Sequence, residues 1–414
     1  MKTLLKIDWL SIFIVLLLIA MGWTTIYSTT LAEEQPNVFD TSKLYGKQLL
    51  WIGMGFFLVI IILSVEAKFY QRFASVIYIL ALLVLLGLPF FGKTIAGQTA
   101  WYSFGSFSVQ PAEFVKAAAA LAIAKYLTGI NVSLKNFKNQ LQVLLLMLLP
   151  MALIMLQPDA GSALMYVAFI IPLYREGLPG IYLIIGALII SIFLTTIKFG
   201  AIYVSLAILL LSIIMLYFKR KSKPNYALSF LVVALCIGFS FASNFIFDKV
   251  LQPHHQDRFE LILGMKSDPL GAEYNTYHSK VAIGSGGLTG KGWLQGTQTT
   301  GKYVPEQHTD YIFSAVGEEW GFVGSSLVVL LFCSLMFRFW FLAERQKSPF
   351  NRIYGYSVLS ILFFHFAVNI GMVIGIFPTV GIPLPFFSYG GSGLWGTLIL
   401  IFIFLKLDAK RMDL

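Results

Sequence analysis

Acidic and proton-exchanging side chains gather where a long polar stretch of this sequence, residues 249–310, meets an apolar run. The stretch ends in Glu306, His308 and Asp310, directly before that run. An aspartate at such a junction commonly caps a helix, since the helix N-terminus favours negative charge. The alternative role is a general base that takes a proton from a bound hydroxyl group. Both roles stay open for Asp310 at this point, and as a general base it would have Glu306 and His308 close by.

The rest of the polar stretch contains glycine, aromatic and basic residues in the proportions that suit a sugar-phosphate ligand. Connections of this length usually carry a function of their own. Cations bind phosphate, and aromatic rings pack on sugar faces. The candidate cations are Arg258, Lys280 and Lys291. The same composition is also that of an ordinary solvated loop, and this alternative stays open.

A second pair of charges lies inside an apolar run. Glu113 and Lys116 are three residues apart, so they share one face of a helix. One interpretation is an ion pair that fixes packing. The other is a pair that lines a polar cavity, which is the more frequent role of ionisable residues within a membrane.

Helix-breaking residues mark two further segments. Asp159 follows Pro158 at a predicted helix start, where capping is its expected role. Residues 377–393 contain three prolines and four glycines. We expect a re-entrant element buried against protein, because lipid does not tolerate unpaired backbone groups. Asn369 precedes it and could satisfy those groups. The motif residues are Pro383, Pro385, Ser388, Gly390 and Gly391.

The elements that position these residues must be membrane helices. Hydrophobic residues make up 57 % of the chain and charged residues 12 %, too little charge for a soluble surface. We predict an all-α polytopic membrane protein, a bundle of about twelve transmembrane helices with a large extracytoplasmic loop at 249–310. The expected spans lie near 9–30, 46–65, 74–91, 110–127, 140–156, 158–174, 179–197, 201–218, 226–248, 312–340, 352–376 and 386–407.

The distribution of charge predicts the orientation. Lys and Arg cluster in alternate connections, which places both termini in the cytoplasm and residues 92–109 and 249–310 outside. The net charge of +10 is therefore explained by a membrane surface, and no nucleic-acid partner is expected. Cys236 and Cys333 both lie in apolar runs, so neither a disulfide framework nor a zinc site is predicted.

Five motifs in order resemble the SEDS family (shape, elongation, division and sporulation). They are QPAEFVK (110–116), QPDAGSAL (157–164), PEQHTDYIFSAVGEE (305–319), NIGMVIG (369–375) and GIPLPFFSYGGSG (381–393). A further segment, GKGWLQGTQT at 290–299, is more similar to the rod-shape branch than to the division branch. The likeness extends from the first span to the last.

The resemblance implies a peptidoglycan glycosyltransferase of the bacterial cytoplasmic membrane. Such an enzyme polymerises lipid II outside the membrane during cell elongation, with a class B penicillin-binding protein and other membrane proteins of the elongation complex. By resemblance Asp310 is the essential residue, Trp101 is the tryptophan of an outer loop, and Glu113 with Lys116 forms a cavity pair. The family has about ten spans in a single membrane domain, here residues 1–414, so we predict an inserted helical hairpin at 179–225.

The predicted mechanism is an inverting transfer. Asp310 takes the proton of an acceptor hydroxyl, which attacks the anomeric carbon of the lipid-linked donor and displaces lipid pyrophosphate. The leaving group needs positive charge, either from Lys116, Arg258, Lys280 or Lys291 or from a divalent cation, Mg²⁺ or Mn²⁺, held partly by Asp310. Two alternatives remain open: a flippase for lipid-linked oligosaccharide, and a non-catalytic scaffold for cell-wall enzymes.

Overall fold

The computed structural model divides the chain into two compact units. One comprises Met1–Leu178 and His278–Leu414, and the other comprises Pro179–Tyr277. The residues described are 6–31, 37–95, 97–105, 107–220, 225–251, 253–266, 268, 271 and 273–411. The predicted loop 249–310 is therefore shared, since its first part belongs to the second unit.

Ten helices within the described ranges are long and apolar enough to cross a membrane, which confirms the helical membrane fold. They are α1 (Trp9–Thr30), α2 (Leu44–Ser64), α3 (Ala67–Phe91), α5 (Phe137–Met155), α8 (Ile181–Phe199), α9 (Ala201–Lys219), α10 (Tyr226–Phe245), α14 (Ile312–Glu344), α15 (Pro349–Val373) and α16 (Gly391–Ala409). The predicted spans 110–127 and 158–174 correspond to shorter elements. These are α4 (Pro111–Leu127), and the run of α6 (Ala160–Leu164), η2 (Met165–Phe169) and α7 (Ile170–Arg175). The count of about twelve is therefore not confirmed.

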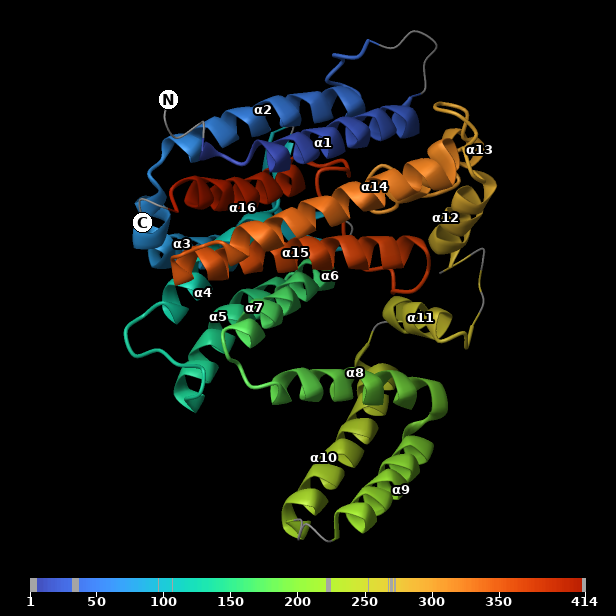
Figure 1. Ribbon diagram of the computed structural model, residues 1–414. Coiled ribbons are helices and arrows are strands. Elements are labelled where there is room, and N and C mark those ends of the chain that lie inside the picture. The colour runs from blue at the N-terminus through green and yellow to red at the C-terminus, as the bar shows by residue number, and fades with distance from the viewer. Residues whose placement is uncertain are drawn as a thin grey trace. The chain divides into compact units, whose positions relative to one another are not determined.

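Helix α4 lies at the centre of the first unit. It packs against α3, α15 and α16, while α14 packs between α1 and α15 (Figure 1). The run Ala117–Ala120 is buried, and such small side chains let neighbouring helices approach closely. As a result Glu113 and Lys116 on the same helix are buried as well.

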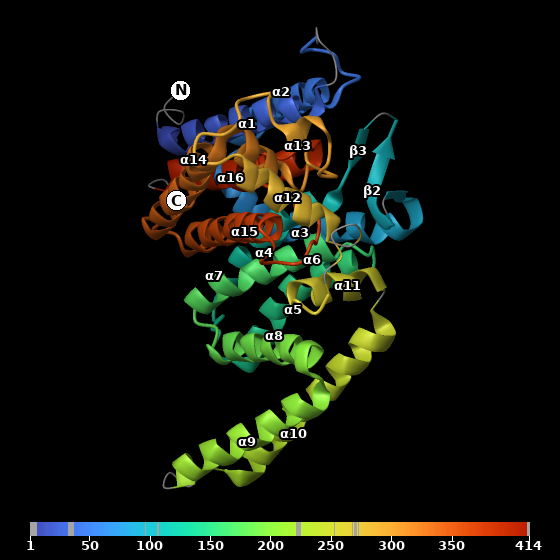
Figure 2. The ribbon, with the colours of Figure 1, turned by 90° about the vertical axis from the view of Figure 1, so that its right-hand side faces the viewer.

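A small sheet follows α3, in a segment predicted only as a loop. It consists of β1 (Lys93–Ile95), β2 (Gln98–Phe104) and β3 (Phe107–Val109), all antiparallel in the order β1-β2-β3 (Figure 2). Trp101 is paired with Lys93 in this sheet. The strands support the connection that leads into α4.

Helix α14 is broken at Gly321, and the glycine-rich segment that precedes the helix packs against this break. Gly321 has φ +63 and ψ −157, so the helix is interrupted there. The amides of Lys291 and Gly292 donate to the carbonyls of Glu318 and Glu319 at 3.0 Å each. A Cβ atom on Gly321 would lie 2.3 Å from the backbone nitrogen of Gly290, so this contact requires glycine. The freed carbonyls of the helix thus find backbone partners, as a membrane environment demands.

The segment between α15 and α16 is non-helical and largely buried, which agrees with the re-entrant element predicted at 377–393. Ile382 packs with Met165 and Val368 in one hydrophobic cluster. At Gly161, near the start of α6, a Cβ atom would lie 2.4 Å from the carbonyl oxygen of Val380. The N-terminal turn of α6 therefore touches the segment directly.

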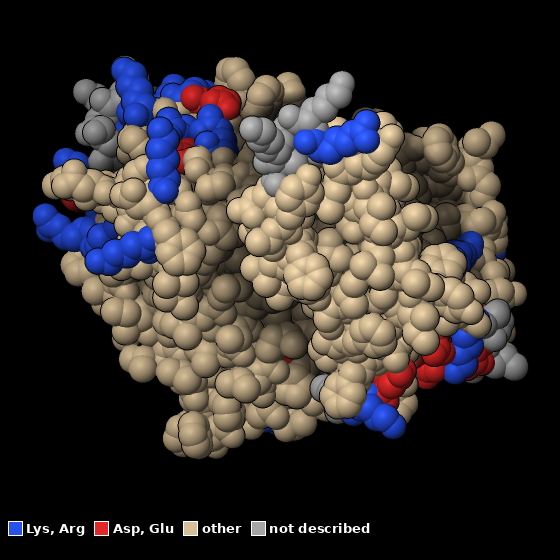
Figure 3. All heavy atoms as spheres, turned by 90° about the horizontal axis from the view of Figure 1, so that it is seen from below, with Lys and Arg blue, Asp and Glu red and all other residues tan. Residues whose placement is uncertain are grey.

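The end of the first unit where α7, α14 and α16 terminate is rich in ion pairs. They are Arg175–Glu344, Arg352–Glu176 and Arg345–Asp408, with N···O distances of 2.8, 3.0 and 2.5 Å. Figure 3 shows wide areas of the surface that carry no charged side chain. An uncharged area of this kind suits contact with lipid.

The second unit is built from α8, α9 and α10, followed by the π-helical turn η4 (Ile246–Val250) and α11 (Pro253–Ile262). Gly200, with φ +85, joins α8 directly to α9 within the range 179–225. Residues 221–224 of this range lie outside the described residues. That the hairpin is an insertion relative to the family stays a prediction.

Candidate functional site

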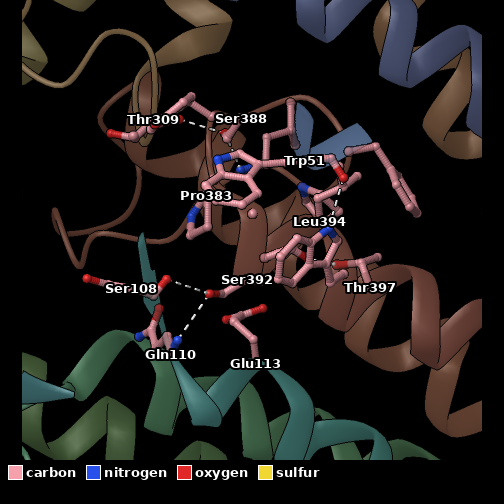
Figure 4. Close-up of a pocket in the computed structure, with 18 of the residues that line it drawn as sticks. Trp51, Ser108, Gln110, Glu113, Thr309, Pro383, Ser388, Ser392, Leu394 and Thr397 are labelled. Carbon is pink, nitrogen blue, oxygen red and sulfur yellow. Dashed lines mark hydrogen bonds between the residues drawn. The ribbon is translucent and has the colours of Figure 1, made fainter. Parts of the chain in front are cut away.

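A cavity of about 300 Å³ opens in the first unit where α2, α4 and α16 begin (Figure 4). Its lining combines aromatic rings with hydroxyl, amide, carboxylate and imidazole groups. It is lined by Lys47, Trp51, Trp101, Phe107, Ser108, Gln110, Glu113, Thr309, His365, Thr397 and residues 383–395 except Phe387. Such a mixture suits a ligand with both apolar and hydroxyl-bearing faces.

One wall is the start of α4, which is held by hydrogen bonds to two other elements. The amide nitrogen of Gln110 donates to Ser392 Oγ at 3.0 Å, and its side-chain Nε2 donates to Asp159 Oδ2 at 2.8 Å. Asp159 also caps α6, because its Oδ1 accepts from the amide of Ser162 at 3.0 Å. The predicted capping role of Asp159 is observed, and the residue also anchors the cavity wall.

Glu113 points from α4 into the cavity (Figure 4) and forms a buried ion pair with Lys116. Lys116 Nζ donates to both carboxylate oxygens, at 2.9 and 2.8 Å. The same nitrogen lies 2.8 Å from His365 Nε2 on α15. Both predicted roles therefore hold at once: the pair is buried, and Glu113 lines a polar cavity.

The opposite wall is the non-helical segment, which is bound to the polar loop ahead of α14. Ser388 Oγ donates to the carbonyl of Thr309 at 2.6 Å and accepts from the amide of Leu384 at 2.8 Å. The amide of Tyr389 donates to the carbonyl of His308 at 2.8 Å. These bonds fix the loop that carries Asp310 against the cavity.

Asp310 is also held through its backbone, by Asn369 on α15. The amide of Asn369 donates to the carbonyl of Asp310 at 2.8 Å and to that of Ile382 at 2.7 Å. This confirms that Asn369 satisfies freed backbone groups. Within the described part of the chain, no hydrogen bond to the Asp310 carboxylate is found, which leaves its oxygens available to a ligand.

Burial raises the pKa of Asp310 to about 7, and the nearby carboxylates of Glu306 and Asp159 act in the same direction. A carboxylate with a pKa near neutrality is a far better proton acceptor than an ordinary aspartate. Gly381 faces this group with φ +69, and a Cβ atom there would lie 3.3 Å from Asp310 Oδ2. A glycine at this position avoids a side chain pressed against the carboxylate.

Glu306 and His308 precede Asp310 on the same loop. Their side chains approach each other only to 4.0 Å, and Glu306 is exposed. Burial lowers the pKa of His308, although the charge of Glu306 partly offsets the effect. His308 is therefore predominantly neutral at neutral pH, and its ring packs edge-on against Tyr389.

The four cations predicted to bind pyrophosphate, Lys116, Arg258, Lys280 and Lys291, do not line the cavity. Lys291 pairs with buried Glu318 at 2.7 Å and holds the loop at 290–299. Lys280 is exposed on α12 (Tyr274–Ser285) and does not line the cavity, while Arg258 belongs to α11 in the second unit. Among the described residues, Lys47 on α2 is the only lysine or arginine in the cavity lining.

A metal site built from protein ligands alone is not evident. In the described part of the chain, no group of three or more His, Cys, Asp or Glu side chains has suitable geometry. Asp310 would thus be a single carboxylate ligand. Mg²⁺ is often bound by one or two carboxylates completed by substrate phosphates and water, so the donor set remains compatible with a shared ion.

Lys47, His365 and Gln110 are among the residues of this cavity that sequence reasoning missed. Lys47 looks like a basic residue at a helix start, and His365 like a lone histidine on an apolar helix. Gln110 belongs to the QPAEFVK motif but carries no charge that would single it out. A positional signal existed only for Gln110, which precedes Pro111 at the helix start.

Comparisons with known proteins define the class. The family model for FtsW, RodA and SpoVE, described as cell cycle proteins, matches residues 8–225 and 203–413. The chain belongs to this family.

Its relatives point to one branch. The peptidoglycan glycosyltransferase RodA of Treponema pallidum (strain Nichols) is 30% identical over 431 residues, covering 98% of each chain. The peptidoglycan glycosyltransferase MrdB of Escherichia coli (strain K12) is 32% identical, covering 83% of this chain and 80% of its own. A solved chain from a study of polymerization and crosslinking by a peptidoglycan synthase complex superposes with a TM-score of 0.71. It is 25% identical and covers 98% of both chains.

Proposed function

We propose that this chain is a peptidoglycan glycosyltransferase that polymerises lipid II into glycan strands during cell elongation. The relatives bear the name of that activity. The observation that carries the proposal is the position of Asp310. Burial raises the pKa of its carboxylate to about 7. The preceding residue, Thr309, lines a cavity of aromatic and polar groups.

The proposed reaction uses Asp310 as general base. Its carboxylate removes the proton of an acceptor sugar hydroxyl as that oxygen bonds to the anomeric carbon of the donor. The bond from this carbon to the pyrophosphate oxygen breaks, lipid pyrophosphate leaves with the electron pair, and the carbon is inverted. Pyrophosphate is a good leaving group, so a second carboxylic acid to protonate it is unnecessary.

Lys47 is the cation best situated for the pyrophosphate. It lines the cavity, whereas Lys116 and Lys291 are each committed to a buried carboxylate. A fixed positive charge stabilises the negative charge that develops on the leaving group. If a divalent ion is bound, Asp310 could serve as its carboxylate ligand, and the ion would supply the same charge.

The orientation follows from the charges. The end of the first unit with the three arginine pairs faces the cytoplasm of a bacterial inner membrane, together with both termini. The cavity lies at the other end, where α2, α4 and α16 begin, and so faces outward. Lipid II reaching the outer leaflet could then enter with its polyprenyl tail still in lipid.

A class B penicillin-binding protein is the proposed partner, alongside other membrane proteins of the elongation complex. The solved structure that this chain resembles comes from a complex that coordinates polymerization with crosslinking. A polymerase that releases uncrosslinked strands needs a transpeptidase close to its product.

The test uses purified protein with lipid II and a class B penicillin-binding protein whose transpeptidase is blocked. We expect glycan polymer on a gel with the pair and none with the partner alone. Lipid II translocation in proteoliposomes without polymer would instead favour the flippase. Polymer that persists unchanged when Asp310 is replaced by asparagine would favour a scaffold.

A further inference from the structure

Lys116 has a second buried partner besides Glu113. Its ammonium nitrogen lies 2.8 Å from Nε2 of His365, a histidine that is 5% exposed on α15. The other ring nitrogen, Nδ1, lies 3.5 Å from the carbonyl oxygen of Pro383. Glu113, His365 and Pro383 all line the cavity.

The donor and acceptor roles in this chain of contacts can be assigned. A lysine ammonium only donates hydrogen bonds, so His365 Nε2 must accept. A histidine whose Nε2 accepts carries its proton on Nδ1 and is neutral. That proton faces the carbonyl of Pro383, an acceptor. The contacts on both sides of the ring therefore select the same tautomer.

His365 and Asn369 are four residues apart on α15, so they share one helix face. Asn369 binds the carbonyl of Ile382, and His365 faces the carbonyl of Pro383, the next residue. Two neighbouring carbonyls of the non-helical segment are thus held by one helix. Asn369 also donates to the backbone carbonyl of Asp310, and His365 also contacts Lys116, the partner of Glu113.

We propose that neutral His365 is a positioning residue for the glycosyl transfer: it orients the Lys116–Glu113 pair and the cavity wall at Pro383. The proposal rests on the proposed function. With His365 in place, the Lys116 ammonium is shared between an imidazole and a carboxylate, which fixes the direction of the Glu113 oxygens. Without it, a buried N–H group of Lys116 loses its acceptor, and the pair is free to reorient.

Three variants separate the two contacts. His365→Gln places an amide oxygen near the position of Nε2 and keeps the acceptor for Lys116. His365→Asn keeps a donor near Nδ1 but cannot reach Lys116. His365→Leu removes both. We expect kcat for glycan polymerisation to fall about tenfold or more in the Leu and Asn variants, with KM little changed, and to recover largely in the Gln variant.

A purely structural role predicts another pattern. In that case the effect on kcat would follow thermal stability in detergent, and the Gln variant would not rescue activity. Equal kcat in wild type and His365→Leu would overturn the proposal. In a Lys116→Met background, His365→Leu should reduce kcat by a smaller factor than it does in the wild type, because only the contact with Pro383 is left to lose.

A measurement that needs no activity distinguishes failure of this proposal from failure of the proposed function. Nitrogen NMR of ¹⁵N-histidine-labelled protein, with His365→Gln to assign the signal, should show a protonated Nδ1 and an unprotonated Nε2. Lys116→Met should weaken this preference, because only the carbonyl of Pro383 then selects the tautomer. A proton on Nε2 in the wild type would refute the proposal, whether or not the protein polymerises lipid II.

Discussion

Asn369 on α15 donates a hydrogen bond of 2.8 Å to the backbone carbonyl of Asp310, which lies 59 positions earlier in the chain. The same amide group donates to Ile382 at 2.7 Å. Asn369 is fully buried, so both bonds form away from water. One side chain therefore joins the loop that carries the proposed base to the segment that walls the cavity.

Replacement of Asn369 by leucine should lower polymerisation about tenfold or more. Two carbonyls lose their donor, and each unsatisfied buried group costs about 1–3 kcal/mol. The matched control is Asn351→Leu on the same helix, since Asn351 is equally buried but contacts Gln346 and Leu407 away from the cavity. We expect the control to lose stability but to keep its activity per folded molecule. Equal activity losses in the two variants would contradict the specific role of Asn369.

Glu318→Gln should loosen the loop at 290–299. The Glu318 carboxylate accepts from Lys291 Nζ at 2.7 Å and from the amides of Gln298 and Thr299 at 2.9 and 2.8 Å. A neutral amide turns an NH₂ group toward some of these donors, and hydrogen bonds to charged groups are worth about 1.5–3 kcal/mol. Hydrogen exchange of residues 290–300 measures the effect. Glu344→Gln, which changes a carboxylate at the other end of α14 bonded to Arg175, is the control and should leave this exchange unchanged.

Lys47→Met should reduce kcat/KM about tenfold, and Lys47→Arg should retain most activity, if Lys47 binds the donor pyrophosphate. Lys43→Met is the control, because Lys43 lies one helical turn away and does not line the cavity. A divalent ion would give the opposite pattern: EDTA would abolish polymerisation, Mg²⁺ or Mn²⁺ would restore it, and Lys47→Met would matter little.

The pH dependence of kcat/KM should show an acid limb near pH 7. The pKa of Asp310 is raised to about 7, so the base form is lost as the pH falls below that value. Glu306→Gln removes one of the charges that raise the pKa of Asp310, so the acid limb should move to lower pH. An unchanged limb would show that another group titrates.

The raised pKa of Asp310 affects stability in the direction opposite to its effect on activity: activity needs the deprotonated carboxylate, whereas the folded state favours the protonated one. The raised pKa means that folding favours protonated Asp310, so its contribution is complete below the unfolded pKa of about 3.8 and disappears as the pH rises through about 7. Asp310→Asn should therefore be at least as stable as the wild type at pH 8, as measured by thermal unfolding in detergent.

Sequence patterns predicted the membrane helices and much of the site. Asp310, Glu113 and Asn369 stand out because polar groups at the edge of, or within, an apolar run are costly without a purpose. Trp101 was predicted only from the family resemblance. His365 does not stand out, since its partner Lys116 is 249 positions away and only the packing of α15 on α4 brings them together.

Other features depend on contacts that no local pattern reveals. Lys291 looks like a ligand-binding cation, yet Glu318 neutralises it from 27 positions away. The break at Gly321 is invisible in an otherwise helical run, because its cause is the backbone of Gly290 lying against the helix. Strands β1 and β3 have three residues each, too few for a clear alternation of apolar and polar residues.

The most direct measurement compares wild type with Asp310→Asn in lipid II polymerisation, at pH 8 and with the same penicillin-binding protein. Asparagine keeps the size of the side chain and the backbone bond to Asn369 but cannot accept the proton. We predict that the variant folds, binds its partner and forms no detectable polymer. Polymer at the wild-type rate would contradict the assignment of Asp310 as the catalytic base.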